Sequence, residues 1–320
     1  MRFNYKKLVA AGAATLSIAA VLTACSGKKS NTSVNKDTKH GIALVTDGNG
    51  VDDHSFNQAA WSGFKDYGKE HGLKQGKGGY QYFESSSAAD FTPNLTQAAQ
   101  AGYQTIYGVG YMLTDSVKAA SKKYPKKNFV LVDSVITGRK NVASVIFKSN
   151  EASYLGGLAA AYTTKTNKVG FIGGDKAKSI AQSMYTDGAD IIYQAAGNAG
   201  NGVFTEAKTR NKATTAAKKV WVIGVDVDQT NLGNYTSKDG KKANFTLTSV
   251  LKGLRFACKD IADKAYKGKF PGGKVISYGL AHDGVSVTKG NLNAKTWKAV
   301  QAARKQILAG KIKVATAPSK

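Results

Sequence analysis

The feature that most constrains this chain is an alternation of short apolar runs with segments of helical periodicity. Residues 41–46 form an apolar run, and in residues 56–71 the apolar side chains recur every three or four positions. The same alternation predicts further strands at 80–84, 105–110, 128–133 and 142–147, and helices at 91–101 and 114–123. Strands that alternate with helices favour a parallel sheet covered by helices.

A second series of the same kind follows. It predicts strands at 169–173, 191–193 and 220–225, and helices at 151–163, 176–187, 202–212, 249–267 and 294–309. We therefore predict an α/β fold with two doubly wound lobes, about 41–150 and about 151–285, between which the chain crosses more than once. Such lobes leave a central cleft that faces the carboxyl ends of the strands, where ligands of open α/β sheets bind.

The first 25 residues have the pattern of an export signal. Arg2, Lys6 and Lys7 precede an uncharged apolar run over 8–22, which is shorter than the ~20 residues of a membrane-spanning helix. The sequence LTAC, ending at Cys25, resembles a bacterial lipoprotein signal, so we expect residues 1–24 to be removed and Cys25 to be lipidated. An ordinary secretory signal is the alternative. Residues 25–40 are polar and predict a flexible tether.

Composition excludes several classes of protein. Cys25 and Cys258 are the whole cysteine content and the four histidines are scattered, so we expect no disulfide scaffold, metal site or cofactor. The chain holds 46 Lys and Arg against 21 Asp and Glu, a net charge of +25. Nucleic-acid binding has no motif behind it, because aromatic and basic residues are not interleaved.

Three loops carry polar groups that suit a ligand site. The segment 46–58 is acidic and Gly-rich, and Ser55 is a predicted N-cap for the helix that follows, although a solvated loop would have the same composition. The Gly-rich stretch 195–204 lacks the order of a dinucleotide fingerprint, and Asp226-Val227-Asp228 is not followed by the residues of a calcium loop. No catalytic set of nucleophile, base and orienting group can be assembled, so we expect no enzyme.

Five segments of the chain resemble a known family. They are TDGNGVDDHSFNQAAWSG, VASVIFKSNEASYLGGLAAAYTT, KVGFIGG, GADIIYQAAGNAGNGVF and VIGVDVDQ. The chain is similar over residues 41–288 to the basic membrane protein family, also called the PnrA-like purine nucleoside receptors. The resemblance implies a type I periplasmic-binding-protein fold. It also implies a lipid-anchored receptor that delivers nucleosides to an ABC transporter.

The resemblance also implies a set of ligand contacts in the first lobe. The base-stacking aromatic of the family falls on Phe56, with Asp47 and Asn57 beside it as hydrogen-bonding groups. Asp133 corresponds to the carboxylate that faces the edge of the base. Because a carboxylate accepts hydrogen bonds, it would favour N–H-rich purines of the guanine or hypoxanthine type.

In the second lobe the resemblance assigns three residues. Phe204 corresponds to the opposing aromatic wall, and Asp226 and Lys252 to the pair that binds ribose hydroxyls. For Phe56 and Phe204 the alternative is packing in the core.

The chain departs from the family pattern at Gly174. In the family, KVGFIGG is followed by another helix and strand, whereas here the sequence continues directly with Asp175-Lys176. We therefore expect the second lobe to be shortened after Gly174. The loss should open a sheet edge and expose apolar surface.

These observations predict an extracytoplasmic, lipid-anchored substrate-binding protein that presents a purine nucleoside to a permease. One alternative is a surface adhesin for acidic or host polymers, which the net charge of +22 on residues 25–320 would favour; residues 1–24 carry three basic and no acidic side chains. A receptor for another solute, such as a sugar, is compatible with the same fold. An enzyme acting on nucleosides is the third alternative.

Overall fold

A computed structural model describes residues 39–173 and 177–317, all of which belong to one compact unit. The expected signal peptide, Cys25, nearly all of the tether and Gly174 lie outside these ranges. No helix within the described ranges is long and apolar enough to cross a membrane.

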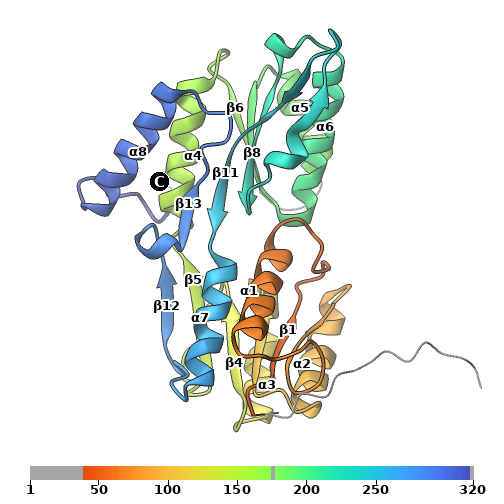
Figure 1. Cartoon of the computed structure of the whole chain (residues 1–320), viewed down its shortest axis with the longest axis vertical. Coiled ribbons are helices and arrows are strands. Elements are labelled where there is room, and N and C mark those ends of the chain that lie inside the picture. Colours follow the sequence, from red (N-terminus) through yellow and green to blue (C-terminus); the bar gives the residue numbers. More distant parts are fainter. Residues whose placement is uncertain (1–38, 174–176, 318–320) are drawn as a thin grey trace, which may run out of the picture. The chain divides into compact units, whose positions relative to one another are not determined.

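The first lobe is built on a six-stranded parallel sheet in the order β12-β5-β4-β3-β1-β2 (Figure 1). Its strands are β1 (Ile42–Val45), β2 (Tyr80–Phe83), β3 (Thr105–Val109), β4 (Asn128–Val132), β5 (Val142–Phe147) and β12 (Val275–Tyr278). Its helices are α1 (Phe56–Glu70), α2 (Phe91–Gln100), α3 (Thr114–Lys123) and α7 (Leu254–Tyr266). One core lies between the sheet and α1 with α7, and a second lies between the sheet and α2 with α3. Both faces of the sheet are therefore buried, as an all-parallel sheet requires.

The second lobe has a five-stranded sheet in the order β13-β11-β8-β7-β6, in which only β13 is antiparallel. Its strands are β6 (Val169–Gly173), β7 (Ile191–Ala195), β8 (Trp221–Asp226), β11 (Thr246–Lys252) and β13 (Val285–Val287). Helices α4 (Ser149–Thr163) and α8 (Ala294–Leu308) cover one face, and α5 (Ala177–Thr186) and α6 (Asn201–Lys212) cover the other. A small pair, β9 (Asn234–Thr236) and β10 (Lys242–Asn244), lies beside this sheet.

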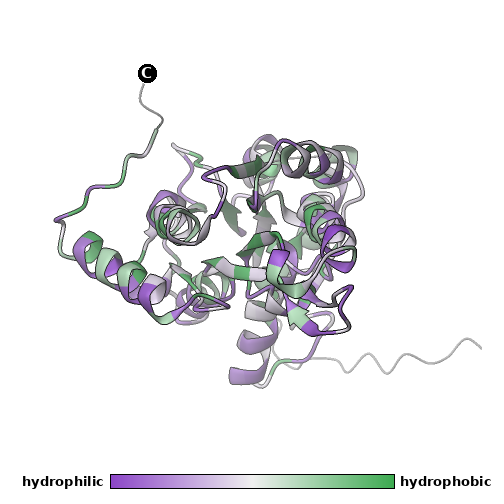
Figure 2. Ribbon diagram, turned by 90° about the horizontal axis from the view of Figure 1, so that it is seen from above, coloured by the Kyte–Doolittle hydropathy of each residue, from purple (hydrophilic) through white to green (hydrophobic). Residues whose placement is uncertain are grey.

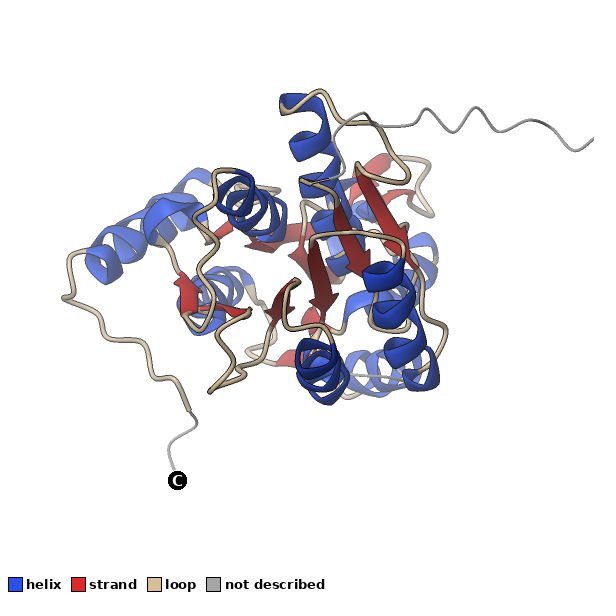
Figure 3. Ribbon diagram, turned by 90° about the horizontal axis from the view of Figure 1, so that it is seen from below, coloured by secondary structure: helices blue, strands red, loops and turns tan. Residues whose placement is uncertain are grey.

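Short 3₁₀ helices occupy several loops: η1 (Ala88–Asp90), η2 (Tyr111–Leu113), η3 (Gly197–Gly200), η4 (Ala216–Lys218), η5 (Thr230–Gly233) and η6 (Ala281–Asp283). Seen from the two ends of the long axis, the helices lie around the strands, and hydrophobic residues occur in both (Figures 2 and 3). The helices mix apolar and polar residues, as the amphipathic pattern predicts.

The chain passes between the lobes three times. It passes from β5 into α4, from β11 into α7, and from β12 through η6 to β13. Residues 254–278 therefore belong to the first lobe, although they follow most of the second lobe in sequence. Three short connections permit the lobes to close on a ligand by bending at the crossings.

One predicted element was wrong. Residues 249–267 are not a single helix, because Thr246–Lys252 is a central strand, β11, and the helix α7 begins only at Leu254. Gly253 separates them, and a Cβ at this position would lie 2.9 Å from the carbonyl oxygens of Asp283 and Gly284. Because a single residue separates the strand from the helix, the sequence has no cluster of turn residues that would mark the boundary.

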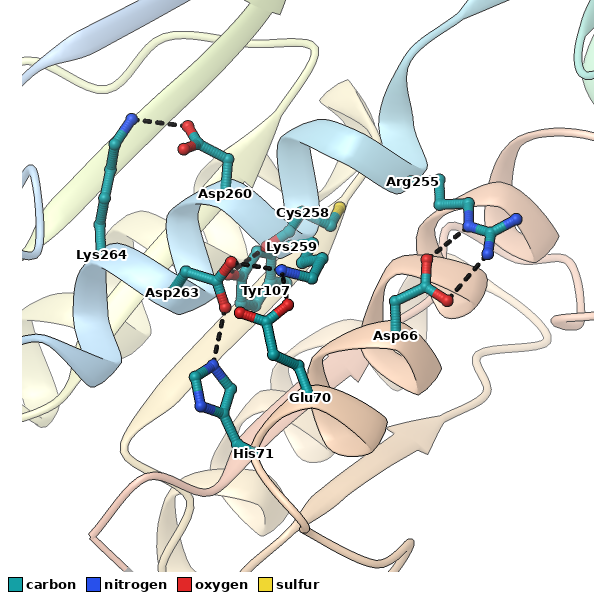
Figure 4. Close-up of polar contacts among 10 residues, drawn as sticks. All are labelled: Asp66, Glu70, His71, Tyr107, Arg255, Cys258, Lys259, Asp260, Asp263 and Lys264. Atoms are coloured by element: carbon teal, nitrogen blue, oxygen red, sulfur yellow. Dashed lines mark hydrogen bonds and ion pairs between the residues drawn. The ribbon is translucent and has the colours of Figure 1, made fainter.

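Helices α1 and α7 cross closely and are joined by ion pairs (Figure 4). Arg255 donates two hydrogen bonds to Asp66, of 2.5 and 2.8 Å. Lys259 Nζ lies 2.6 Å from carboxylate oxygens of both Glu70 and Asp263. The Lys259 ammonium group therefore supplies the positive charge that both carboxylates contact.

His71 completes the same cluster. Its Nε2 lies 2.9 Å from Asp263 Oδ1, on the far side of that carboxylate from Lys259. In the core beneath, the Tyr107 hydroxyl donates to the carbonyl oxygen of Cys258 at 2.9 Å. These contacts fix α7 against the first lobe immediately after Lys252.

Candidate functional site

A cavity of about 550 Å³ lies between the lobes and is lined by both of them. Its polar lining comes from the carboxyl ends of strands: Asp47 follows β1, Asp133 follows β4, Asp226 ends β8 and Lys252 ends β11. This is the position at which open α/β sheets hold their ligands. Its size lies within the range of small-molecule sites.

The sequence-predicted residues divide into two groups. The cavity is lined by Asp47, Phe56, Asp133, Asp226 and Lys252. Asn57 and Phe204 are not among the lining residues, and both are buried.

Asp53, rather than Ser55, caps helix α1. The Asp53 carboxylate accepts hydrogen bonds from the backbone N–H groups of Ser55 and Asn57, each at 2.9 Å, and of Gln58 at 3.1 Å. The predicted N-cap bond of Ser55 is absent. Its hydroxyl instead donates to Asp226 Oδ2 at 2.5 Å, a contact between the lobes. A capping carboxylate close by in sequence leaves the serine hydroxyl available for the cleft.

Asn57 acts on the cleft through Asp47. Its side-chain amide donates to Asp47 Oδ1 at 2.8 Å and so fixes that carboxylate at the cavity wall. Burial raises the pKa of Asp47, and the hydrogen bonds from Asn57 and Asn49 partly oppose this shift. Gly110, which has a φ of 120°, makes room for the carboxylate, because a Cβ there would lie 2.8 Å from the Asp47 Cβ.

Lys252 connects the walls of the cleft. Its Nζ lies 2.5 Å from Asp133 Oδ2 and 4.9 Å from the centre of the Phe56 ring, within the range of a cation–π contact. The ammonium group thus covers part of one ring face. It also forms an ion pair with Asp133, the carboxylate that is expected to recognise the edge of the base.

Asp226 is the most buried of the charged residues that line the cavity. Burial raises the pKa of its carboxyl, while the Lys252 ammonium and the Ser55 hydroxyl act in the opposite direction. Asp133 and Asp226 have φ values of 65° and 64°, in the left-handed region that costs energy for residues other than glycine. Both strands therefore end in the same unusual backbone turn at the cleft.

The charge of the cavity is opposite to that of the chain. Three carboxylates, of Asp47, Asp133 and Asp226, face a single ammonium, that of Lys252. Carboxylates accept hydrogen bonds and repel anions. The site therefore suits a neutral ligand that is rich in N–H and O–H donors.

Phe204 does not fit the expected role of an aromatic wall. It lies on the inner face of α6, is 4% exposed, and packs in the core with its ring 6.1 Å from that of Phe245. The position of Phe204 is therefore that of a core residue, which was the alternative prediction for it. The second-lobe aromatics that line the cavity are Tyr193 and Phe171. Tyr193 lies on β7 and ends the predicted strand 191–193. Its place at the carboxyl end of that predicted strand is the sequence feature that could have identified it as a cavity residue.

Further hydrogen bonds join the acidic loop to the second lobe. Gln229 Nε2 donates to the carbonyl oxygen of His54 at 3.1 Å, and Asn198 Nδ2 donates to Asn49 Oδ1 at 3.2 Å. Together with the Ser55–Asp226 bond, they close the cleft on the side of this loop. On another part of the cavity wall, Tyr111, Met112 and Phe171 are exposed by 68%, 50% and 60%.

The described residues that line the cavity include no histidine and no cysteine. The serines of this lining, Ser149 and Ser153, have no histidine beside them there. A nucleophile, a base and an orienting group do not meet there. The arrangement is that of a binding site.

Comparison with solved structures identifies the fold. The chain is similar to an ABC transporter solute-binding protein from Aeropyrum pernix, with a TM-score of 0.71 and 19% identity over 87% of this chain and 94% of that one. A solute-binding protein from Conexibacter woesei aligns with a TM-score of 0.62 and 15% identity, over 86% of this chain and 98% of that one. The predicted α/β fold of the solute-binding type is confirmed.

Comparison of sequences finds relatives that span nearly the whole chain. The chain is 45% identical to the ABC transporter nucleoside-binding protein BmpA of Lactococcus lactis, over 98% of this chain and 99% of the relative. It is 42% identical to the CD4+ T-cell-stimulating antigen of Listeria monocytogenes, over 87% of this chain and 88% of that protein. These relatives span nearly the whole chain.

The alignments also bear on the expected shortening. The Lactococcus alignment runs over 353 positions, 33 more than the 320 residues of this chain. The family described as "ABC transporter substrate-binding protein PnrA-like" matches in two pieces, residues 39–176 and 174–317, which meet just after β6. Both observations fit a segment missing after Gly174.

The two pieces of the family match together cover every described residue. Members of this family bind solutes for ABC transporters outside the cytoplasm and are not enzymes, as expected from the sequence. The chain belongs to the PnrA-like family of ABC transporter substrate-binding proteins.

Proposed function

We propose that this protein binds purine nucleosides and presents them to the permease of an ABC transporter. The observation that carries the proposal is the cavity between the lobes, which is lined by Phe56 and by the carboxylates of Asp47, Asp133 and Asp226. A flat base stacks on an aromatic ring, and single-stranded nucleic acids gain ~1–3 kcal/mol per stacked base. The similarity to a relative named as nucleoside-binding supports the same ligand class.

The polar groups suit a nucleoside in detail. Asp133 accepts N–H groups from the edge of a guanine or hypoxanthine base. Asp226 accepts a ribose hydroxyl and Lys252 donates to one, which requires Lys252 to share its contact with Asp133. The excess of carboxylates favours nucleosides over nucleotides, because a phosphate would meet like charge.

Ligand binding then shifts the lobes toward the closed form. The three crossings bend, and contacts such as Ser55 to Asp226 form only when the lobes meet. A ligand that binds both lobes stabilises the closed state by its differential affinity. The permease would recognise the closed surface.

We further propose that Cys25 carries the lipid that holds the protein at the outer face of the cytoplasmic membrane. Residues 25–40 would then be the tether, and residues 41–320 the two-lobed binding domain. Lobe 1 is about 41–150 and lobe 2 about 151–285, with chain crossovers by which residues 254–278 return to the first lobe. Several acyl chains bind a membrane stably where one chain does so only marginally. Replacing Cys25 with serine should release the protein from the membrane fraction; retention of the Cys25→Ser variant would contradict the anchor.

Thermal melting of the full-length protein in detergent tests the ligand. Guanosine or inosine at ~100 times its dissociation constant should add ~2.7 kcal/mol of apparent stability. The variant Phe56→Leu, which keeps apolar bulk but removes the ring, should lose most of the shift. Phe64→Leu is the matched control, because Phe64 lies in the same helix and the same core as Phe56 but does not line the cavity.

The other outcomes distinguish the alternatives. A shift with a sugar but not with nucleosides would replace the proposed ligand. Binding to acidic polymers that fades as salt rises, without a nucleoside shift, would favour adhesion. Release of free hypoxanthine from inosine would show an enzyme.

A further inference from the structure

We propose that a groove in the second lobe, between helix α6 and the β9–β10 pair, is a binding site for phosphate groups. The groove has a volume of about 450 Å³ and is lined by Lys208 and Lys212 of α6, by Tyr235 of β9 and by Lys242 of β10. It shares no lining residue with the cavity between the lobes. The inference is therefore independent of the proposed nucleoside site.

The three lysines of the groove lack opposite charges. In residues 39–173 and 177–317, none of their ammonium groups has an ion-pair or hydrogen-bond partner. Glu206, on the same helix, pairs with Arg210 at 2.7 Å. Asp239, in the turn between β9 and β10, pairs with Lys241 at 3.3 Å. These two carboxylates already have their own cations, so the groove keeps an excess of positive charge.

The spacing of Lys208 and Lys212 brings like charges together. Residues four apart on a helix lie ~5–6 Å apart at Cβ, and like charges at that spacing are destabilising. The helix dipole favours Lys212, because it ends α6, but Lys208 lies one turn earlier and Lys242 belongs to another element. An anion between the ammonium groups would remove the repulsion among them.

Tyr235 adds an uncharged donor to the groove. It is 7% exposed, and its ring lies 5.6 Å from that of Phe245 in the core that includes α6. Its buried hydroxyl has no hydrogen-bond partner in the part of the chain that the structure describes. A buried hydroxyl without a partner is unfavourable, and an oxygen of a bound anion can accept its hydrogen bond. Three ammonium groups and a hydroxyl suit the charge and the several acceptor oxygens of phosphate groups.

Calorimetric titration of the full-length protein in detergent with inorganic tripolyphosphate tests the site. Lys208→Gln combined with Lys212→Gln should raise the dissociation constant about 2- to 30-fold, by loss of two exposed charge contacts. Tyr235→Phe should raise it about 10- to 150-fold, by loss of a hydrogen bond to a charged group.

The matched control is Lys118→Gln combined with Lys122→Gln. It removes the same charge at the same spacing from exposed positions of α3, in the first lobe. At an ionic strength of about 0.15 M it should leave the dissociation constant unchanged, because charges farther away than ~8 Å are largely screened.

Competition identifies the source of the phosphate. Displacement of tripolyphosphate by phosphatidylglycerol in the micelles, but not by phosphatidylcholine, would assign the site to a lipid headgroup. Lack of displacement by either lipid would assign it to a free anion.

Three results would overturn the proposal. The first is a wild-type protein that does not bind tripolyphosphate. The second is an equal loss of affinity in the α3 control, because net charge and not the groove would then hold the anion. The third is an unchanged affinity in Tyr235→Phe. Thermal melting checks the fold of this variant, which without the anion should melt at or above the wild-type Tm because it no longer buries an unpaired hydroxyl.

Discussion

The close crossing of helices α1 and α7 makes Gly63 a position where a methyl group should be destabilising. A Cβ on Gly63 would lie 2.4 Å from the carbonyl oxygen of Arg255 and 3.2 Å from its carbonyl carbon. These are backbone atoms of α7, so no side-chain rotation relieves the contact. The helices must move apart, or the substitution is not accommodated.

The expected magnitude combines two opposing effects. Replacing glycine by alanine inside a helix is worth about 0.8–1.0 kcal/mol of stability. Overpacking in a tightly packed interior costs about 1–3 kcal/mol. The net effect of Gly63→Ala on the free energy of unfolding is therefore a loss of about 0–2 kcal/mol.

Gly157 provides the matched control. It lies inside helix α4, is exposed, and a Cβ there would meet nothing within 4 Å. Gly157→Ala should therefore raise the free energy of unfolding by about 1 kcal/mol, from the higher helix propensity of alanine alone. The two variants should differ by about 1–3 kcal/mol, although each adds one methyl group to a helical glycine.

Thermal and urea unfolding of both variants measures this difference. Each 1 kcal/mol should move Tm by about 2–4 °C in a domain of this order of size. The same variants should differ in ligand response. Gly63 lies about two turns after Phe56, and Arg255 lies three residues after Lys252, so a wider crossing displaces two walls of the cleft.

The nucleoside-induced shift of Tm should consequently be smaller in Gly63→Ala than in Gly157→Ala. If Gly63→Ala raises Tm as much as Gly157→Ala does, the inferred backbone contact between the helices is wrong. If Tm falls but the ligand shift is unchanged, the helix crossing supports the fold without setting the cleft geometry.

Three further predictions concern other parts of the chain. Burial raises the pKa of Cys258 to about 12, so its thiol should not react with a thiol reagent until the protein unfolds, and a lipidated Cys25 should contribute no second thiol. Burial raises the pKa of Asp263, but hydrogen bonds from Lys259 and His71 outweigh it, and the net shift is downward. Its stabilising contribution is therefore present above the unfolded pKa of ~3.9 and lost as pH falls through the folded value. Urea unfolding from about pH 6 to about pH 3 should show a steeper loss in the wild type than in Asp263→Asn. Lys252→Met should weaken inosine binding about 10- to 150-fold, by loss of a charged hydrogen bond; an unchanged titration would exclude Lys252 as a ligand contact.

The strands and the polar wall of the site could be predicted because they follow one rule. In parallel sheets buried strands are apolar runs, and the residue after each run lies at the carboxyl edge. Asp133 follows such a run directly and Asp226 ends another, so their convergence follows from the pattern. The acidic loop after the first strand places Asp47 at the same edge.

The parts that could not be predicted depend on packing that the pattern does not encode. Phe204 and Tyr193 are both aromatic residues beside the Gly-rich loop. Which of them faces the cleft depends on the rotation of α6 against the sheet. The capping of α1 by Asp53 instead of Ser55 depends on loop geometry, since both side chains can accept the same backbone bonds. Strand β11 was missed because Gly253 alone separates it from α7.

The expected shortening follows β6, which lies at an edge of the second sheet and not at its centre. β6 is the last strand in the order β13-β11-β8-β7-β6, and its Val169 and Phe171 are largely exposed. Asp226 and Lys252 come from β8 and β11, which are paired on both sides. Because removal of an edge strand and its covering helix leaves those pairings intact, the ligand groups keep their support. The lobe should therefore tolerate the loss at the cost of an open edge beside β6.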